Sequence, residues 1–362
     1  MNTTARKQEA DAAEVFGIYE GQEILAVTIA NGNGLRAKLI TFGARLTELY
    51  VPDRNGDVAD VVLGFDTIDE YAATDTYFGA TCGRYGNRIE GGRFVLDGVE
   101  HHLNVNEGAN HLHGGVQGFD RKVWDIETVT ADSVVFRTTS EDGEMGFPGK
   151  SNLRATYTLT ADNTLRIVME ADTTKTTLMN MVHHSYFNLA GQGSGDVLRH
   201  DVRISSRFYT PVDDELLATG EILSVRGTPF DFTEFKAIGA DIDRLPSVGA
   251  TIFEAGGGYD HNWCLDGGPG LRRCIDVHEP VSGRRMTMHT MEPGVQFYTA
   301  GYLSDKVMGK KGKRLCKYGG FTLETQKYPG SPNFSHFPSC RLDPGETYRH
   351  EMVFSFGTDA AS

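Results

Sequence analysis

Apolar and polar residues alternate along several segments of this chain, and this period of two constrains the fold more than any other feature of the sequence. In residues 151–170 the alternation pauses at Ala161-Asp162-Asn163, where Asp and Asn favour a turn, and then resumes. A strand with this pattern buries one face and exposes the other. The segment is therefore predicted to be a β-hairpin with one buried face.

The same pattern predicts two more hairpins, at residues 94–103 around Asp97-Gly98 and at residues 274–288 around residues 280–283. Helical periodicity is scarce, and short helices are expected near residues 69–73 and 241–245. No G-x-G-x-x-G segment follows a strand and opens a long helix, which argues against a nucleotide-binding α/β fold. The spacing of the strands favours an all-β sandwich.

The length of the chain allows one domain or two. Its 362 residues, 39% of them apolar, are enough for one sizeable core. No linker rich in Pro and Ser, no charge block and no low-complexity tract marks a domain boundary. We expect a flexible N-terminal segment at residues 1–15 and a single β-sandwich domain at residues 16–358.

The net charge of −14 limits the partners of the protein, because it repels nucleic acid phosphates and anionic lipid surfaces. A short basic run at residues 310–314 is expected to be a solvent-exposed loop. Neither nucleic acid nor a membrane is expected as a partner.

The sequence also bears on the compartment. It has no apolar stretch long enough for a signal peptide or for the roughly 20 residues of a membrane span. The five cysteines are scattered and form no C-x-x-C pair, which is typical of reduced thiols and argues against a cysteine zinc site. We expect a soluble, cytoplasmic protein.

Glu324 lies in a segment with the alternation of a strand. Thr322, Glu324 and Gln326 share one face, so the carboxylate would stand among hydrogen-bonding side chains. This arrangement suits a carboxylate that lines a polar cleft. An ordinary solvent-facing glutamate is the alternative.

Histidines occur in two further segments. His183 and His184 are adjacent, so on a strand they face opposite ways and at most one can enter a given site. His111 and His113 share a strand face, and His101-His102 lies ten residues upstream. A metal site there would need a third histidine or a carboxylate nearby, and we do not expect one.

Two polar segments complete the set. Arg84 and Arg88 flank a Gly-rich stretch and could offer guanidinium donors to a ligand, or form surface salt bridges. Asp260 and Asn262 follow a glycine run among aromatic residues, which suits either a sugar or a simple Asx-turn. Together on an acidic, β-rich chain, these segments favour a small polyhydroxylated substrate.

At these same residues the sequence closely resembles the aldose 1-epimerase (galactose mutarotase) family, from residue 32 to about residue 357. Six motifs carry the resemblance in order along the chain. They are Gly83-Arg84-Tyr85-Gly86-Asn87-Arg88-Ile89, Asn110-His111-Leu112-His113-Gly114-Gly115, His184-Ser185-Tyr186-Phe187-Asn188-Leu189, Tyr259-Asp260-His261-Asn262, Glu292-Pro293-Gly294-Val295-Gln296-Phe297-Tyr298-Thr299 and Leu323-Glu324-Thr325-Gln326.

The resemblance implies a large antiparallel β-sandwich of the galactose mutarotase-like kind. It also implies that the enzyme interconverts the α and β anomers of a free aldohexose, D-galactose or D-glucose, with no cofactor and no metal. By this likeness Glu324 is the catalytic base and His184 the acid. Asn87, Arg88, His113, Asp260 and Gln296 match positions that contact the sugar.

Three departures from the family pattern are visible. Val182-His183 replaces the usual Thr-Asn before the acid, Gly86 replaces Ala, and Gly330 replaces Asp. The Ser-Tyr-Phe-Asn-Leu run that follows fixes the register, so His184 rather than His183 remains the expected acid. A neighbouring carboxylate is expected to favour the imidazolium form of His184 and to give a bell-shaped pH profile.

Other functions remain open from the residues alone. A glycoside hydrolase could use Glu324 and Asp260, a non-catalytic sandwich could only bind sugar, and a related epimerase could act on a sugar phosphate. The preferred aldose and the oligomeric state are not determined by the sequence.

Overall fold

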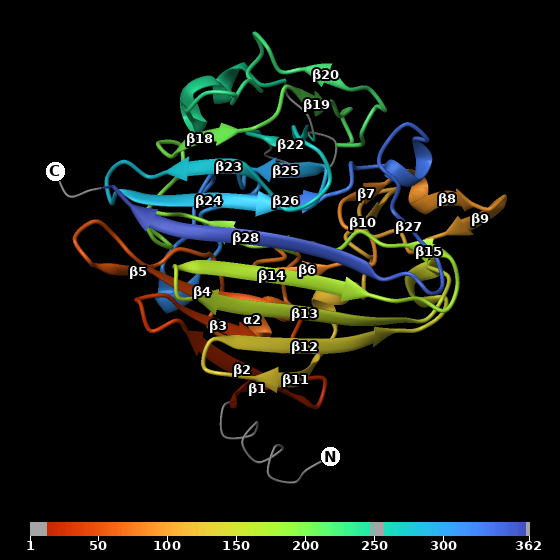
Figure 1. Ribbon diagram of the computed structural model, residues 1–362, viewed down its shortest axis with the longest axis horizontal. Coiled ribbons are helices and arrows are strands. Elements are labelled where there is room, and N and C mark those ends of the chain that lie inside the picture. The colour runs from red at the N-terminus through yellow and green to blue at the C-terminus, as the bar shows by residue number, and fades with distance from the viewer. Residues whose placement is uncertain (1–12, 247–248, 250–256, 360–362) are drawn as a thin grey trace.

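A computed structural model describes residues 13–246, 249 and 257–359 (Figure 1). It confirms the all-β fold, because strands dominate and the strands of its sheets pair antiparallel. The largest sheet has nine strands in the order β11-β12-β13-β14-β28-β24-β23-β18-β21. Its strands are β11 (Asp125–Val129), β12 (Ser133–Ser140), β13 (Ser151–Thr160), β14 (Thr164–Ala171), β28 (Tyr348–Thr358), β24 (Arg284–Thr290), β23 (Arg272–His278), β18 (Asp201–Ile204) and β21 (Lys236–Ala237).

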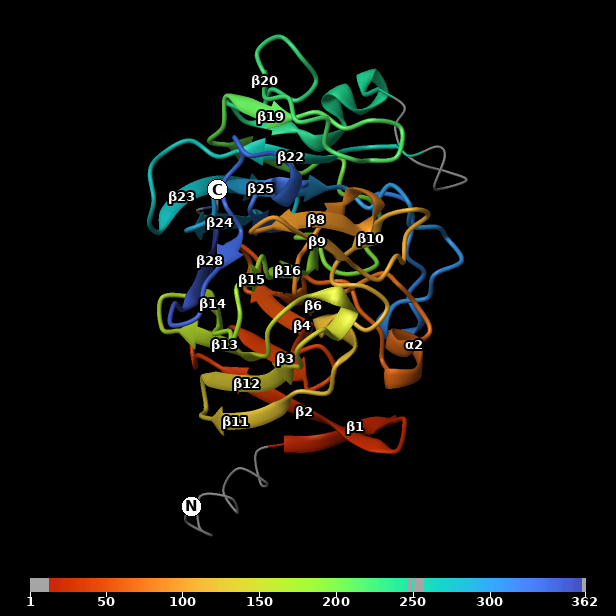
Figure 2. The ribbon, with the colours of Figure 1, turned by 90° about the vertical axis from the view of Figure 1, so that its right-hand side faces the viewer.

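Two further sheets contain most of the remaining strands. The first five strands of the chain pair in sequence order: β1 (Ala13–Tyr19), β2 (Gln22–Ala30), β3 (Arg36–Ile40), β4 (Arg45–Pro52) and β5 (Val58–Asp60). A six-stranded sheet has the order β17 (Tyr186–Phe187), β26 (Phe321–Gln326), β25 (Gly294–Tyr298), β22 (Asp260–Cys264), β19 (Phe208–Thr210) and β20 (Leu223–Ser224). Figures 1 and 2 show β1 and β20 at opposite ends of the molecule.

Short elements connect the sheets. Four two-stranded pairs are β6 (Ala80–Cys82) with β16 (Val182–His184), β7 (Arg88–Ile89) with β10 (His111–Leu112), β8 (Arg93–Leu96) with β9 (Val99–His102), and β15 (Thr177–Leu178) with β27 (Arg341–Leu342). The helical elements are α2 (Ile68–Ala72) and the 3-10 turns η1 (Glu90–Gly92), η2 (Phe119–Arg121), η3 (Glu144–Gly146), η4 (Ile238–Arg244), η5 (Lys310–Gly312) and η6 (Ser331–Asn333).

One apolar cluster joins the three large sheets. The nine-stranded sheet lies against the other two in the side view (Figure 2), and residues from all three meet between them. These include Phe136, Tyr157 and Phe354 from the nine-stranded sheet, Ile29 and Leu39 from the first sheet, and Trp263, Phe297 and Leu323 from the six-stranded sheet. A core shared by stacked sheets is the arrangement of a β-sandwich, as predicted.

The predicted hairpins are present as β13-β14, β8-β9 and β23-β24. Of the two predicted helices, the first is α2, whereas the second, η4, is a 3-10 helix. The predicted N-terminal segment, residues 1–15, lies largely outside the described residues. Its last three residues belong to β1.

The basic run at residues 310–314 is not wholly exposed. Lys310 is buried, and its ammonium group donates hydrogen bonds to the carbonyl oxygens of Thr47 and Val62 and lies 2.6 Å from Asp60 Oδ2. The prediction of a solvated loop was therefore wrong for this residue. A buried ammonium group needs such partners, and a sequence run cannot show them. Within the described ranges, no helix combines the length and apolarity that a membrane crossing requires.

Candidate active site

Three neighbouring strands of the six-stranded sheet place polar side chains in one row. In the register of this sheet, Asn262 of β22 lies opposite Gln296 of β25, and Gln296 lies opposite Glu324 of β26. Side chains of directly opposed residues emerge on the same face of a sheet, so all three point the same way. Asp260 lies two residues before Asn262 and therefore shares this face.

The opposite wall comes from shorter elements. His184 is the last residue of β16, which is held by pairing with Ala80 of β6. Arg88 begins β7 and pairs with Leu112 of β10, and His113 follows that strand directly. Residues from six separate parts of the sequence thus meet at one place.

The two walls enclose a cavity of about 250 Å³. All seven residues that the sequence analysis assigned to the site line it, namely Asn87, Arg88, His113, His184, Asp260, Gln296 and Glu324. Its volume lies slightly below the range of about 300–1,000 Å³ that is common for drug-sized ligands. A single sugar ring is the size of ligand that this cavity suits.

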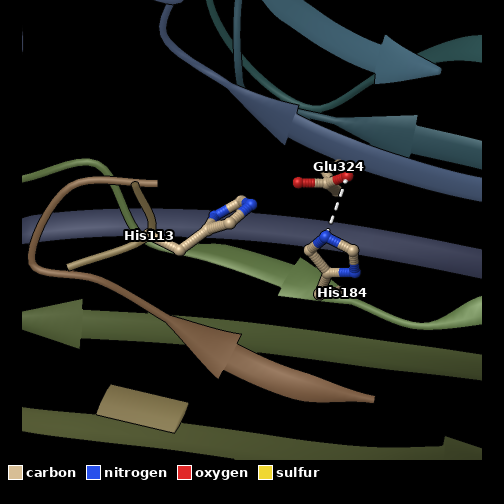
Figure 3. Close-up of side chains that lie close together, drawn as sticks. All are labelled: His113, His184 and Glu324. Carbon is tan, nitrogen blue, oxygen red and sulfur yellow. Dashed lines mark ion pairs between the residues drawn. The ribbon is translucent and has the colours of Figure 1, made fainter. Parts of the chain in front are cut away.

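Glu324 and His184 lie side by side in the cavity. His184 Nε2 is 3.4 Å from Glu324 Oε1 (Figure 3). The same oxygen accepts a hydrogen bond of 2.8 Å from Thr322 Oγ1. The second oxygen, Oε2, faces His113 in Figure 3 and has no hydrogen-bond partner within the described part of the chain. A buried carboxylate oxygen without a partner is rare in structural sites and leaves a free lone pair for chemistry.

Burial sets the charge state of this pair. Glu324 is 2% exposed and His184 4% exposed. Burial raises the pKa of Glu324 to about 8 and lowers the pKa of His184 to about 3, because each group loses the water that stabilises its charge. A nearby carboxylate was expected to favour the imidazolium form of His184, but burial lowers the pKa of His184 and favours the neutral ring.

Arg88 is held in place by a residue that the sequence analysis missed. Its Nε and Nη2 atoms donate to the two carboxylate oxygens of Glu107, at 2.5 and 2.7 Å. Burial alone would lower the pKa of Arg88, but the charges of Glu107 and Asp260 raise it above its ordinary value. Glu107 stands in a loop without a recognisable motif, so no sequence pattern could have indicated this role.

Asp260 is fixed by Gln296, whose Nε2 donates to Asp260 Oδ1 at 2.7 Å. Burial raises the pKa of Asp260, and the nearby Arg88 and the hydrogen bond from Gln296 partly oppose this shift. The group therefore stands between a guanidinium and an amide, as an acceptor suited to sugar hydroxyls. Asp260 belongs to β22, so the alternative of a simple Asx-turn does not hold.

His113, His184 and Glu324 each offer one possible ligand atom, and these three atoms lie within 4.8 Å of one another. However, His113 Nδ1 accepts a hydrogen bond of 3.2 Å from the backbone N–H of Asn87. Burial, followed by the charges of His184 and Arg88, also lowers the pKa of His113 well below its usual range, so the ring is neutral. A neutral ring that accepts at Nδ1 carries its proton on Nε2, where it can donate to a sugar oxygen but offers a metal no lone pair.

Four other candidates lie outside the cavity. Arg84 is buried and donates to the carbonyl oxygens of Pro148 and Gly149. His111 forms a 2.7 Å hydrogen bond through Nδ1 with the carbonyl oxygen of Asn104, and His101 and His102 belong to the separate β8-β9 hairpin. Of the pair His111 and His113, His113 lines the cavity and His111 does not.

His183 faces away from its neighbour, as strand geometry predicted. Its Nδ1 lies 3.3 Å from the Tyr157 hydroxyl and its Nε2 lies 2.7 Å from Ser185 Oγ. Burial lowers the pKa of His183 to about 3, so it is a neutral member of the core. As strand geometry predicted, at most one histidine of the pair enters the cavity, and it is His184.

Comparison with known proteins identifies the family of this chain. A sequence profile described as aldose 1-epimerase matches residues 26–355. Bovine galactose mutarotase is 43% identical over 322 residues, which are 89% of this chain and 91% of that protein. The chain belongs to the aldose 1-epimerase family. An aldose 1-epimerase of Escherichia coli strain K12 is 33% identical and covers 93% of this chain and 96% of its own length.

Solved structures of aldose 1-epimerases have the same fold. An aldose epimerase homologue from C. elegans superposes with a TM-score of 0.85 at 31% identity and covers 92% of this chain and 98% of its own. Galactose 1-epimerase from Lactobacillus acidophilus gives a TM-score of 0.80 at 25% identity, with 96% and 98% covered. The protein is an isomerase with aldose 1-epimerase activity, and its ligand is a monosaccharide.

Proposed function

We propose that the cavity binds one aldohexose, D-galactose or D-glucose, and that Glu324 and His184 interconvert its anomers as base and acid. One observation carries the proposal: a buried carboxylate and a buried imidazole lie 3.4 Å apart in a cavity of about 250 Å³. The relatives named galactose mutarotase support galactose as a substrate.

The chemistry follows from the hemiacetal. Glu324 takes the proton of the C1 hydroxyl while His184 gives a proton to the ring oxygen, so the bond between C1 and the ring oxygen breaks and an open-chain aldehyde forms. Rotation about the C1–C2 bond presents the other face of the aldehyde. Ring closure reverses both proton transfers and yields the other anomer. The two proton transfers balance each other, so the reaction needs no other reactant.

The pair must hold one proton between its two members for this step. Because burial disfavours both charges, the resting pair is a neutral carboxyl group beside a neutral imidazole. Transfer of that proton from Glu324 to His184 produces the carboxylate and the imidazolium that the reaction uses. Groups this close titrate together, so the pair and not either residue has the apparent pKa values.

The remaining residues bind the sugar. Glu107 holds the Arg88 guanidinium and Gln296 holds Asp260, so a cationic donor and an anionic acceptor stand ready for neighbouring hydroxyls. His113 donates from Nε2, since its Nδ1 accepts from Asn87. Fixed donors and acceptors of this kind orient the ring before reaction.

A neutral sugar fits the cavity better than a sugar phosphate. Among the described residues that line it, Arg88 is the one Lys or Arg, and its charge is already balanced by Glu107. A phosphate would bring two negative charges beside Asp260 and Glu324 without a further cation.

A panel of substrates tests the proposal. Exchange between anomers, followed by NMR magnetisation transfer, is expected to accelerate for galactose or glucose but not for the hexose 6-phosphate. A nitrophenyl galactoside, which would report a glycoside hydrolase, is expected to stay intact. A preference for the phosphate, release of nitrophenol, or sugar binding without accelerated exchange would each overturn the proposal.

A further inference from the structure

Tyr77 occupies the boundary between the sugar cavity and a larger groove of about 820 Å³. Four residues line both hollows, namely Asp75, Tyr77, Glu107 and Leu112. Tyr77 is the aromatic member of the four. A half-buried aromatic ring at the mouth of a sugar site is well placed to contact the bound ligand.

The ring of Tyr77 packs against both imidazoles of the site. Its centroid lies 4.8 Å from that of His113 and 5.5 Å from that of His184. His184 has no hydrogen-bond partner for Nδ1 among the described residues, so packing of neighbouring rings helps to hold this imidazole. Tyr186 and His113 pack against it with centroid separations of 5.1 and 5.0 Å, and Tyr77 adds a third ring.

The backbone around Tyr77 is tied to the strand that carries the proposed acid. Tyr77 has φ of 55°, a left-handed conformation that is uncommon for a bulky residue and recurs at ligand sites. Its carbonyl oxygen accepts from Ala80 N–H at 3.0 Å, and Gly79 N–H donates to the carbonyl oxygen of His184 at 3.0 Å. The turn therefore fixes Tyr77 relative to His184.

The hydroxyl group of Tyr77 differs from those of several buried tyrosines. Tyr71, Tyr85 and Tyr157 each use their hydroxyl in a hydrogen bond to protein. Within the described ranges the Tyr77 hydroxyl has no such hydrogen bond, although the residue is half-buried. Burial raises its pKa well above the usual value, so the group keeps its proton and remains a donor.

We propose that Tyr77 is a further substrate-positioning residue: its ring holds the imidazoles of His113 and His184, and its hydroxyl donates a hydrogen bond to a sugar hydroxyl at the mouth of the cavity. The inference rests on the proposed function and adds a residue to that site.

Two substitutions separate the two parts of the proposal. Tyr77→Phe keeps the ring and removes the hydroxyl. KM for α-D-galactose is expected to rise about three- to tenfold with kcat unchanged, because the lost hydrogen bond stabilises the bound ground state and the transition state equally. Tyr77→Leu also removes the ring, so kcat is expected to fall by a further factor of about ten or more as the imidazoles lose their packing. Tyr19→Phe is the matched control, because Tyr19 lines the groove but not the cavity.

The outcomes are distinct. A Tyr77→Phe enzyme with wild-type kcat and KM would overturn the role of the hydroxyl, and a Tyr77→Leu enzyme with the kcat of Tyr77→Phe would overturn the role of the ring. If Tyr77→Leu fails to fold, the split between KM and kcat in Tyr77→Phe decides, and a fall in kcat alone would contradict the proposal. A wild-type enzyme that accelerates no sugar would instead refute the proposed function.

Discussion

At the scale of single residues, the site depends on two buried groups whose environments favour their neutral forms. A carboxyl group whose pKa is raised and an imidazole whose pKa is lowered hold one shared proton over a wide range of pH. At rest the proton lies on Glu324, and it must pass to His184 before Glu324 can act as the base. The pKa values of these two groups therefore predict how the rate of the reaction depends on pH.

The first prediction concerns the pH profile. Above about pH 8, the value to which burial raises the pKa of Glu324, both groups lose their protons and no acid remains. Below about pH 3, the value to which burial lowers the pKa of His184, both are protonated and no base remains. We therefore expect kcat/KM to be level from pH 5 to near neutrality and to fall above about pH 8. A free histidine titrates at about pH 6.5. A loss of activity centred near that pH would contradict this account.

The second prediction concerns stability. The Glu324 carboxyl group keeps its proton up to about pH 8 in the folded protein but loses it near 4.5 in the unfolded chain. Its folded pKa is raised, so the folded state loses stability as the pH rises between these values. Glu324→Gln removes this penalty and should be more stable than wild type by roughly 1–3 kcal/mol at pH 7.5. Thermal unfolding of both proteins at pH 4.5 and 7.5 measures this gain in stability. An equal difference in stability between variant and wild type at the two pH values would refute the prediction.

Some of these residues were predictable from the sequence and others were not. Strand alternation separated His184 from His183 and placed Glu324 with Thr322, because facing depends only on position along a strand. The same argument could not distinguish His113 from His111, which share a face but meet different neighbours. Which of them enters the cavity depends on how the sheets stack, and the charge state of Glu324 depends on burial that only the folded chain creates.

At the scale of elements, two departures from the family pattern prove to be in contact. A Cβ atom at Gly86 would lie 2.5 Å from Val182 Cγ1 and 2.8 Å from its Cγ2. Gly86 stands where the family usually has Ala, and Val182 where it has Thr. The segment of Arg88 and the strand of His184 are thus fitted to each other at this point.

The third prediction follows from this contact. Gly86→Ala should destabilise the protein by about 1–3 kcal/mol through overpacking against Val182. Adding Val182→Ala should recover part of the loss, so a double-mutant cycle by urea unfolding is expected to give a favourable coupling of about 0.5 kcal/mol or more. Strictly additive effects would show that the two residues do not constrain each other.

Hairpins were the elements best predicted from the sequence, because their pattern and turn chemistry are local. The short pairs β6-β16 and β7-β10 were not predictable as elements. Each contains strands of two or three residues that lie far apart in the sequence, too short for alternation to be recognised. These pairs nevertheless carry His184 and Arg88 into the site.

At the scale of the whole molecule, the shared apolar core suggests one cooperative unit. We propose that residues 16–358 form a single domain, as expected from the sequence. The two tryptophans lie in different regions of the core, since Trp124 precedes β11 at one edge of the nine-stranded sheet and Trp263 lies within β22 of the six-stranded sheet. Both are fully buried and so report locally on unfolding.

The fourth prediction uses these tryptophans. In the variants Trp124→Phe and Trp263→Phe a single tryptophan remains, and its fluorescence follows one region. If the chain unfolds as one unit, the fluorescence midpoint of each variant in urea should coincide with its midpoint by far-UV circular dichroism. Separate midpoints within one variant would show that the two regions unfold independently and would refute the single domain.

The central claim is that Glu324 is the base of an aldose 1-epimerase, and the most direct test is polarimetry of freshly dissolved α-D-galactose with wild type and Glu324→Gln side by side. The buffer should contain little phosphate, so that spontaneous mutarotation is slow. We predict that wild type accelerates the change in rotation and that Glu324→Gln is slower by about 10²–10⁴-fold, the contribution of one general base. A folded Glu324→Gln protein with most of the wild-type rate would contradict the account.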